Sequence, residues 1–456
     1  MTDADRIYAR FPDFIKEYIY SHGWSELREI QLVAADVIFN SENNLLLSSS
    51  TASGKTEAAF FPIISDIYEN PPEKKSISVL YIAPLKSLIN DQFYRLDDLL
   101  EESGLPLTHW HGDVGASHKN RLLKNPEGIL QITPESLESM IINRSNDIPR
   151  LFSGLKYVVI DEVHALIGQD RGNQVLCLLS RLSRLISYNP RRIGLSATLG
   201  DLTVAAEWLG AGSGRDTVAP LSPKTPLKWR LGLEHFYIQN PEETQAGAHS
   251  SAEADAKAAL DAGYEFLYDA VYGKKALVFS NSREETEYVT ATLRQISKKR
   301  GDNDIFLIHH GNLSTSLRED AELKMKEDSA EPVVTCATVT MELGIDIGKL
   351  ERVCQVGSPT TVAGFLQRLG RSGRRGSPPE MIMVFREEMA LPNAPLPEII
   401  PWDLLRGIAI IDLYSTERFI EPPKIKKMPL SLAFHQTLST LMSSGELSAK
   451  ALAERV

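Results

Sequence analysis

The chain has 456 residues, of which 43% are hydrophobic and 24% are charged, and its formal net charge is −11. The length is enough for about three domains, and the composition is that of an ordinary soluble globular protein. The acidity argues against a surface that is basic all over, as in many simple DNA-binding domains, but it leaves room for a locally basic groove. No apolar run approaches the roughly 18 residues that span a bilayer, and the N-terminal residues lack the apolar core of a signal peptide. We therefore expect a cytoplasmic protein.

Short runs rich in Val and Ile alternate with helical patterns along the chain, which predicts parallel α/β architecture. The first half has candidate strands at residues 45–47, 79–83, 129–132, 157–160 and 193–195. The second half has candidate strands at residues 276–279, 305–308, 333–337, 353–356 and 381–385. Polar segments with Gly and Pro, at residues 210–225 and 240–251, separate the two series.

We therefore expect an α/β fold with two parallel-sheet domains and a third segment, divided at 1–215, 216–390 and 391–456. The third segment is Pro-rich and then helical, with helices expected at 430–442 and 448–456 around a Ser-Gly pair. This pattern is that of the opening of a winged-helix fold, and we expect the fold to be truncated because no recognition helix or wing follows.

Three cysteines occur, Cys177, Cys336 and Cys354, each inside an apolar run and none at a metal-ligand spacing. They are expected to be reduced, buried side chains.

The stretch SSSTASGKTEAAF, residues 48–60, follows an apolar run and leads into a helical pattern. The usual phosphate-binding pattern is GxxxxGK[ST], and here Ser49 stands at its first Gly. Gly54 lets the backbone approach a phosphate, Lys55 adds a charge, and the Thr56 hydroxyl can bind Mg²⁺. Alone, the tripeptide is more often a plain strand-to-helix connection, so the rest of the chain must decide. Pro62 falls inside the helix and is expected to kink it.

The segment LKYVVIDEVHAL ends a buried-looking strand in two carboxylates, Asp161 and Glu162. Ligands of parallel α/β folds bind at this end of the strands. Asp161 suits coordination of Mg²⁺, and Glu162 suits polarising the water that attacks a γ-phosphate. A solvated strand end is the alternative, but the phosphate loop in the same domain favours a nucleotide site.

Ten blocks follow one another in order: STASGKTEAAF, APLKSLINDQ, HGD, TPESL, DEVHAL, LSATLG, VFSNSREETE, HHGNLS, ATVTMELGIDIG and FLQRLGRSGRR. The series resembles the motif set of the superfamily 2 DExH-box helicases, and most closely that of the Lhr-like (large helicase-related) branch. The similarity spans about residues 31–375. It departs from the family at Ser49, Ser50 and Ala52, where the family usually has Ala, Pro and Gly.

The resemblance implies two RecA-like domains with ATP between them and one nucleic acid strand across both. The residues that it assigns to ATP are Gln31, Ser53, Gly54, Lys55, Thr56, Gly344, Asp346, Arg371 and Arg374. Those that it assigns to Mg²⁺ are Thr56 and Asp161. Those that it assigns to catalysis are Lys55, Asp161, Glu162, Gln367, Arg371 and Arg374. Those that it assigns to coupling hydrolysis to movement are His164, Ser196 and Thr198.

Within these sets, Gln31 resembles the Gln that reads adenine, and Phe11, Phe14 or Trp24 is expected to stack on the base. Arg371 and Arg374 lie on one face if their segment is helical, and they resemble fingers that stabilise the transition state. Each assignment has a plainer alternative. Gln31 would be a surface amide, and Arg371 and Arg374 would be a solvated basic face. Gly344 and Asp346 would form a tight turn, and Ser196 and Thr198 would be ordinary caps.

By family position, nucleic acid contacts fall on loops of both domains, where plain loop capping is the alternative. These residues are Pro84, Lys86, Thr133, Pro134, Glu135, Ser280, Asn281, Ser282, Arg283, Thr338 and Thr340. Three further histidines, His111, His309 and His310, lack acidic or Cys partners at ligand spacing, so they are read as parts of the HGD and HHG blocks rather than as a metal site.

The resemblance implies an ATP-dependent translocase and helicase that moves 3′ to 5′ on single-stranded DNA. It would unwind DNA or RNA:DNA duplexes in DNA repair or genome defence. An RNA helicase is the near alternative, because contacts to the backbone do not by themselves select the sugar. An ATP-switched clamp or scaffold that does not unwind is the second alternative.

Overall fold

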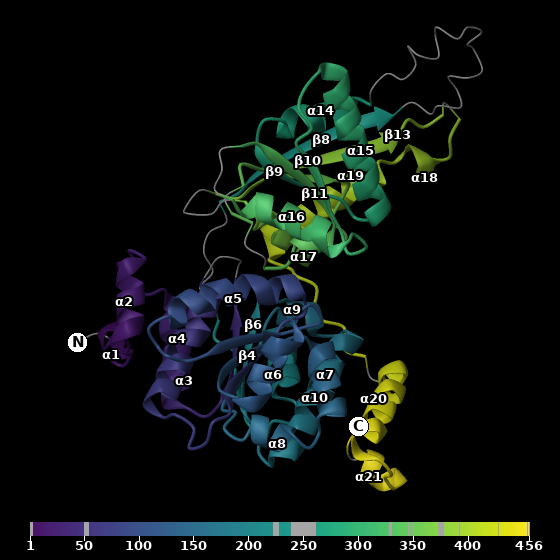
Figure 1. Cartoon of the computed structure of the whole chain (residues 1–456). Coiled ribbons are helices and arrows are strands. Elements are labelled where there is room, and N and C mark those ends of the chain that lie inside the picture. The colour runs from purple at the N-terminus through teal and green to yellow at the C-terminus, as the bar shows by residue number, and fades with distance from the viewer. Residues whose placement is uncertain are drawn as a thin grey trace. The chain divides into compact units, whose positions relative to one another are not determined.

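The computed structural model describes residues 3–49, 54–221, 228–238, 261–327, 331–344, 347–348, 350–372, 378–391, 393–426, 428–453 and 455. The chain forms two compact units, one of Met1–Lys224 with Pro422–Val456 and the other of Thr225–Glu421 (Figure 1). Each unit has its own parallel sheet and its own hydrophobic core.

The first unit is built on a seven-stranded parallel sheet. Its strands are β1 (Asn44–Ser48), β2 (Ile77–Ile82), β3 (Leu107–Trp110), β4 (Gly128–Ile132), β5 (Tyr157–Ile160), β6 (Arg191–Ser196) and β7 (Thr217–Val218). They lie in the order β3-β4-β2-β5-β6-β1-β7. The five strands expected from the sequence are all present. The sequence missed β3 and β7, because β3 is a half-buried strand at the edge without a run of Val and Ile and β7 has only two residues.

Helices cover both faces of this sheet. Successive strand residues point to opposite faces, and Leu45 and Leu46 of β1 are both fully buried. Helix bounds are α1 (Asp3–Ala9), α2 (Asp13–Ser21), α3 (Glu29–Asn40), α4 (Lys55–Glu69), α5 (Lys86–Leu100), α6 (Ala116–Lys124), α7 (Pro134–Asn143), α8 (Ile148–Leu151), α9 (Val163–Leu166), α10 (Asp170–Ile186) and α11 (Leu202–Gly210). Each fully buried Leu or Phe contributes about 1.5–3 kcal/mol, so the strands are held mainly by these two apolar layers. Pro62 lies within α4 and does not end the helix. Because proline has no backbone N–H, the backbone oxygen of Ala58 loses its helical hydrogen-bond donor.

The second unit is built on a six-stranded parallel sheet. Its strands are β8 (Arg230–Ile238), β9 (Lys275–Phe279), β10 (Phe306–His309), β11 (Val333–Ala337), β12 (Arg352–Val356) and β13 (Glu380–Glu388). They lie in the order β10-β11-β9-β12-β13-β8. The five expected strands are present, and β8 was missed because its edge position mixes charged, glycine and aromatic residues. The expected fold class, parallel α/β in two tandem domains, is confirmed.

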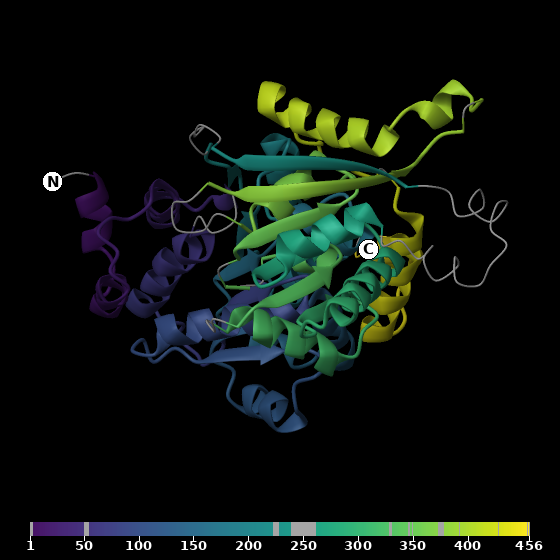
Figure 2. The ribbon, with the colours of Figure 1, turned by 90° about the horizontal axis from the view of Figure 1, so that it is seen from above.

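The helices of the second unit also lie on both faces of its sheet. They are α14 (Ala262–Val271), α15 (Arg283–Arg300), α16 (Thr315–Lys326), α17 (Val362–Leu369), α18 (Leu396–Ile399) and α19 (Trp402–Glu417), with a short 3₁₀ turn at Val339–Met341. Figure 2 shows α19 lying along β13, where a Cβ on Gly407 would stand 2.5 Å from Cζ of Phe385. A glycine at this position therefore permits the close approach of helix and strand.

The segment expected as a third domain is shared between the two units. Residues 391–421 belong to the second unit, and residues 422–456 return to the first. The expected helices correspond to α20 (Leu430–Ser444) and α21 (Ala449–Ala453). Helix α20 packs against α7 and α10, as Figure 1 shows. Whether these helices open a winged-helix domain stays a prediction.

Cys336 and Cys354 are buried free thiols, and burial raises the pKa of each to about 12. Cys177 is only half-buried, so the expectation of burial is wrong for this residue. Among the helices of the described residues, none combines the length and the hydropathy needed to cross a bilayer.

Candidate functional site

The phosphate loop joins β1 to α4. Gly54 precedes the helix with a φ of 83°, the left-handed conformation that glycine adopts without strain. Lys55 begins the helix, and its Nζ donates to the backbone oxygen of Ser49 at 2.7 Å. Thr56 follows, half-buried, while Ser53 lies outside the described residues. The helix N-terminus and Lys55 therefore present the N–H groups and the charge that bind an anion.

Gln31 lies beside this loop. Its Oε1 accepts from the backbone N–H of Arg28 at 2.8 Å, in the capping box that begins α3. Its Nε2 is buried, has no hydrogen-bond partner among the described residues, and lies 3.1 Å from the position of a Cβ on Gly54. Buried donors without acceptors are uncommon. The burial of Gln31 excludes a surface amide.

Arg28 also lies over the loop, although the sequence did not single it out. Its Nη1 lies 3.5 Å from the same Cβ position on Gly54. A lone arginine at a helix start forms no pattern by itself, so only the fold reveals its place.

Three aromatic residues were expected to compete for stacking on the base. Phe11 is buried, with its ring centre 5.8 Å from that of Phe61 and 5.9 Å from that of Phe39. Stacking needs an accessible ring face, so Phe11 is excluded. Phe14 and Trp24 are half-buried and stay candidates.

The acid pair follows β5. Asp161 accepts from the backbone N–H of Glu162 at 2.8 Å and from the hydroxyl of Tyr81 on β2. Burial raises the pKa of Asp161 to about 6, the charge of Glu162 adds to the rise, and the charge of Lys55 opposes it. Tyr81 was missed by the sequence analysis because a Tyr inside an apolar strand looks like an ordinary core residue.

Glu162 itself has a left-handed backbone, with a φ of 49°. This conformation costs a residue with a Cβ about 1–2 kcal/mol, and such strain is concentrated at functional sites. The turn aims the carboxylate toward His164, with Glu162 Oε2 3.4 Å from His164 Nδ1.

The coupling residues join the ends of β5 and β6. His164 Nδ1 accepts from the backbone N–H of Ala197 at 3.2 Å and lies 3.4 Å from the Ser196 hydroxyl. Thr198 is exposed nearby. The segment after Glu162 is thus hydrogen-bonded directly to the Ser-Ala-Thr segment. A shift at the end of β5 is therefore transmitted to the end of β6.

The strand order places these pieces together. Strands β5, β6 and β1 are neighbours, so the acid pair, the Ser-Ala-Thr segment and the phosphate loop follow adjacent parallel strands at one edge. The carboxyl edge of such a sheet is where ligands of open α/β folds bind.

The nucleic acid candidates of the first unit follow the other strands of the same edge, β2 and β4. Pro84 is buried, and Lys86 begins α5 with its Nζ 2.9 Å from Asp113. Thr133 caps α7, whose first residue is Pro134. Glu135 forms a bidentate salt bridge with Arg171, with N–O distances of 2.7 and 2.8 Å. Thr133 thus has the plain loop-capping role that was given above as the alternative to nucleic acid contact.

In the second unit, one group of nucleic acid candidates follows β9. Ser280 is buried, and its hydroxyl has no hydrogen-bond partner among the described residues. Ser282 caps α15 by accepting from the N–H of Glu285 at 3.0 Å. Asn281 donates its N–H to Glu285 at 2.8 Å, and Arg283 is exposed on the first turn.

A second group follows β11. The Thr338 and Thr340 hydroxyls lie 3.5 Å apart. His309 Nδ1 lies 2.8 Å from the Thr340 hydroxyl, and His309 Nε2 lies 2.9 Å from a carboxylate oxygen of Glu322. A carboxylate only accepts, so Nε2 donates to Glu322. His309 therefore links the Thr340 hydroxyl to Glu322.

The segment that holds Arg371 is not helical where the structure describes it. Helix α17 ends at Leu369, and Arg371 lies in the turn that follows, where its guanidinium donates to the backbone oxygen of Glu342. Gln367 is half-buried on α17. Arg374 and Asp346 lie outside the described residues, and Gly344 lies in a bend two residues after Glu342. The helix ends because Gly370 follows it, and glycine disfavours helical continuation.

Two of the three histidines pair with acids, and the third contacts an amide. His310 Nε2 lies 3.0 Å from Glu287, besides the His309 pair with Glu322, and His111 Nε2 lies 3.0 Å from the amide oxygen of Asn90. Within the described part of the chain, no group of three His, Cys, Asp or Glu side chains could hold a metal ion.

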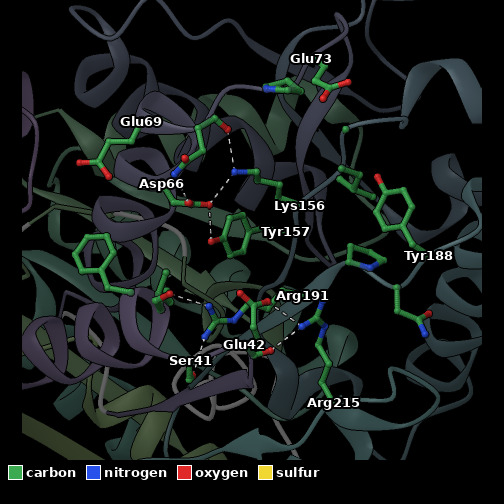
Figure 3. A pocket seen from close by; sticks show the side chains of 18 of the residues that line it. Ser41, Glu42, Asp66, Glu69, Glu73, Lys156, Tyr157, Tyr188, Arg191 and Arg215 are labelled. Carbon is green, nitrogen blue, oxygen red and sulfur yellow. Dashed lines mark hydrogen bonds and ion pairs between the residues drawn. The ribbon is translucent and has the colours of Figure 1, made fainter.

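A cavity of about 1000 Å³ lies in the first unit at the start of the strands, away from the phosphate loop. Figure 3 shows two polar clusters in its wall, one of Asp66, Lys156 and Tyr157 and one of Ser41, Glu42, Arg191 and Arg215. Asp66 accepts from the Tyr157 hydroxyl at 2.8 Å and from Lys156 at 3.3 Å, and Arg215 pairs with Glu42 at 3.0 Å. These side chains therefore bond to one another within the wall of the cavity.

Two family models match the chain. The DEAD/DEAH box helicase model matches residues 28–205, and the helicase conserved C-terminal domain model matches residues 259–376. The chain is 34% identical over 351 residues to the ATP-dependent helicase Lhr-Core of Methanocaldococcus jannaschii, covering 73% of this chain and 38% of that one. The chain belongs to the Lhr-like helicases of superfamily 2. It is also 30% identical to the Lhr helicase/uracil glycosylase of Escherichia coli, over 74% of this chain and 25% of that one.

Solved structures agree with this membership. The helicase Lhr of Mycobacterium smegmatis, bound to ssDNA and AMP-PNP, has a TM-score of 0.74 and 25% identity, over 98% of this chain and 57% of that one. The DUF1998 helicase MrfA bound to DNA has a TM-score of 0.72 at 24% identity, a likeness of fold alone. The chain thus spans less than two thirds of the length of each of these four proteins.

Proposed function

We propose that this Lhr-like chain is an ATP-dependent nucleic acid translocase and helicase. The observation that carries the proposal is the carboxyl edge of the first sheet, where Gly54 and Lys55 follow β1 and the pair Asp161 and Glu162 follows β5, with Gln31 of α3 beside Gly54. A nucleoside triphosphate needs these three features, which are an anion-binding helix start, a base-reading donor and acids for metal and water.

The residues present fit Mg²⁺ as well as ATP. The Thr56 hydroxyl and the buried Asp161 carboxylate would hold the ion, which when bound neutralises charge on the β- and γ-phosphates. Lys55 places its charge on the phosphates, and Glu162 accepts the proton of the attacking water. Arg371 and Arg374 of the second unit stabilise the charge that develops on the γ-phosphate, and Gln367 orients the water. His164, Ser196 and Thr198 couple ATP hydrolysis to domain movement.

The polymer is single-stranded DNA, held by backbone amides and hydroxyls after β2, β4, β9 and β11. The likeness to a helicase bound to ssDNA and AMP-PNP supports this choice. We include in the proposal movement from 3′ to 5′, unwinding of DNA or RNA:DNA duplexes, a cytoplasmic location and a role in DNA repair or genome defence. An RNA helicase is the near alternative, since phosphate contacts do not select the sugar.

Stimulation of ATP hydrolysis by polymer tests the proposal. Turnover is measured alone, with an oligothymidylate and with an oligouridylate of equal length. We expect DNA to raise kcat more than RNA does. A larger effect of RNA selects the RNA helicase, and no effect of either polymer contradicts the motor.

The variant Glu162→Gln separates catalysis from binding. It removes the proton acceptor but keeps the shape, so kcat falls by about 10²–10⁴-fold, and ATP affinity is unchanged. A fluorescent ATP analogue measures the affinity. The matched control is Glu127→Gln, a surface residue that pairs with Lys75 at 3.1 Å and should turn over like the wild type. Loss of ATP binding in Glu162→Gln would show that its role is assigned wrongly.

A further inference from the structure

Arg368 on α17 is the centre of a buried hydrogen-bonded network in the second unit. Its Nε donates to a carboxylate oxygen of Glu342, and its Nη1 donates to the amide oxygens of Gln355 and of Asn281, the latter at 3.1 Å. The guanidinium carbon also lies 5.3 Å from the ring centre of Phe279. One planar group thus joins a helix, a strand and two loops.

The network reaches the finger through Glu342. The side chain of Glu342 binds Arg368, and its backbone oxygen accepts from the guanidinium of Arg371. Glu342 therefore holds both arginines, one by its side chain and one by its main chain. Displacement of Arg368 therefore shifts Glu342, and with it the backbone oxygen that accepts from Arg371.

The other end of the network is the loop after β9. Asn281 accepts from Arg368 and donates its Nδ2 to the backbone oxygen of Ser358 at 2.8 Å. Its backbone N–H donates to Glu285 at 2.8 Å. Three of its four polar groups, Oδ1, Nδ2 and the backbone N–H, are used within the unit, so the side chain of Asn281 has one orientation, which depends on Arg368. This loop is one of those proposed to contact the polymer.

The geometry needs arginine rather than another cation. Arg368 and Glu342 are both buried, and a buried charge is tolerated only with a partner and with hydrogen bonds to its other groups. Five N–H donors in a rigid plane meet acceptors in different directions, whereas an ammonium group is a compact point charge. Gln355 is held in turn, because its Nε2 donates to the oxygen of Val356 at 2.6 Å.

We propose that Arg368 is a positioning residue that couples polymer contact at Asn281 to the placement of Arg371, through Glu342. The inference rests on the proposed function, since it requires polymer-stimulated hydrolysis. The path is continuous, from Asn281 to Arg368, to Glu342 and to Arg371, and each step is a hydrogen bond within one unit. Its two ends are expected to respond as one element.

The test compares ATP turnover of Arg368→Met with that of the wild type over a range of oligothymidylate concentrations. We expect kcat at saturating DNA to fall by about tenfold, with the half-saturating DNA concentration changed less than about twofold. Arg368→Lys keeps the charge but lacks the planar fork, so it should not restore kcat. The matched control is Arg352→Met, which breaks a pair with Glu380 at 2.9 Å on β12 and β13 and should behave as the wild type.

A double-mutant cycle measures the coupling itself. Asn281→Ala and Arg368→Met break the same path, so their effects on DNA-stimulated kcat should be less than additive, whereas Asn281→Ala and Arg352→Met should add. Additive effects in the first cycle, or a defect of Arg368→Met that higher DNA concentrations cure, overturn the inference. Wild-type turnover that DNA does not stimulate overturns the proposed function instead.

Discussion

Gly54 lies where the proposed phosphate loop meets helix α4. Its φ of 83° belongs to the left-handed region, and a Cβ there would stand 3.1 Å from Nε2 of Gln31. A side chain at this residue therefore strains the backbone by about 1–2 kcal/mol and also presses on the proposed base-reading amide.

We expect Gly54→Ala to weaken ATP binding by at least about tenfold, or ~1.4 kcal/mol. Titration with a fluorescent ATP analogue measures the change. Gly23→Ala is the control, since Gly23 has a φ of 66° in the same unit and nothing within 4 Å of its Cβ position. It carries similar backbone strain without touching the loop, so its ATP affinity should be that of the wild type. Equal affinities in both variants would contradict this account of Gly54.

At the scale of the element, helix α14 begins on a half-buried ion pair. Asp261 caps the helix by accepting from the N–H groups of Gly263 and Tyr264, at 2.9 and 3.4 Å. Arg386 on β13 donates to Asp261 and, at 2.6 Å, to the Tyr264 hydroxyl, with its guanidinium 3.7 Å from the Tyr264 ring centre. Burial by itself would raise the pKa of Asp261, but the hydrogen bonds and charge of Arg386 outweigh it and lower that pKa.

The lowered pKa fixes the sign of a pH dependence. The pair stabilises the fold above the unfolded pKa of about 3.9, and the contribution is lost as the pH falls through the lower folded value. Arg386→Met should cost about 2–3 kcal/mol at neutral pH, and the difference from the wild type should shrink below about pH 4. Denaturant unfolding at both pH values measures it. Arg300→Met, which breaks exposed pairs with Glu265 and Asp269, should cost less than about 1 kcal/mol. A pH-independent difference would contradict the role of Asp261.

Elements with a buried, continuous apolar pattern could be predicted from the sequence, and so could residues inside dense motifs. Strand β5 and its acid pair are an example, because burial on both faces leaves a run of Tyr, Val and Ile. Strand β8 could not be predicted, since its edge position allows mixed residues. Arg28, Tyr81 and Arg368 were missed for another reason. Each acts on a neighbour that is set by the fold, and no local pattern marks such a partner.

At the scale of the whole molecule, the chain leaves the first unit, builds the second and returns to the first with α20. In this helix, polar side chains face the unit and large apolar side chains face solvent, which is the reverse of an ordinary surface helix. Gln436 and Ser439 are buried against the unit, whereas Leu430, Phe434 and Met442 are exposed. Apolar burial therefore contributes little to its docking, and polar contacts must hold it.

Arg181 on α10 supplies those contacts. It donates to the Ser439 and Ser443 hydroxyls at 2.7 and 3.0 Å, and it lies 3.7 Å from Glu138. Gln436 donates to Glu138 at 2.8 Å. Burial lowers the pKa of Arg181, which the charge of Glu138 opposes. The arginine is thus stable only while both the acid and the helix are in place.

We expect Arg181→Met to release α20 and to destabilise the first unit by about 2–4 kcal/mol, because Glu138 stays buried without its cation. Limited proteolysis should then cut residues 422–448 about tenfold faster than in the wild type, an increase that corresponds to ~1.4 kcal/mol of easier opening. Arg184→Met, an exposed residue on the same helix, is the control and should be cut at the wild-type rate. If Arg181→Met is also cut at the wild-type rate, then the polar network does not hold α20, and its few buried apolar contacts must suffice.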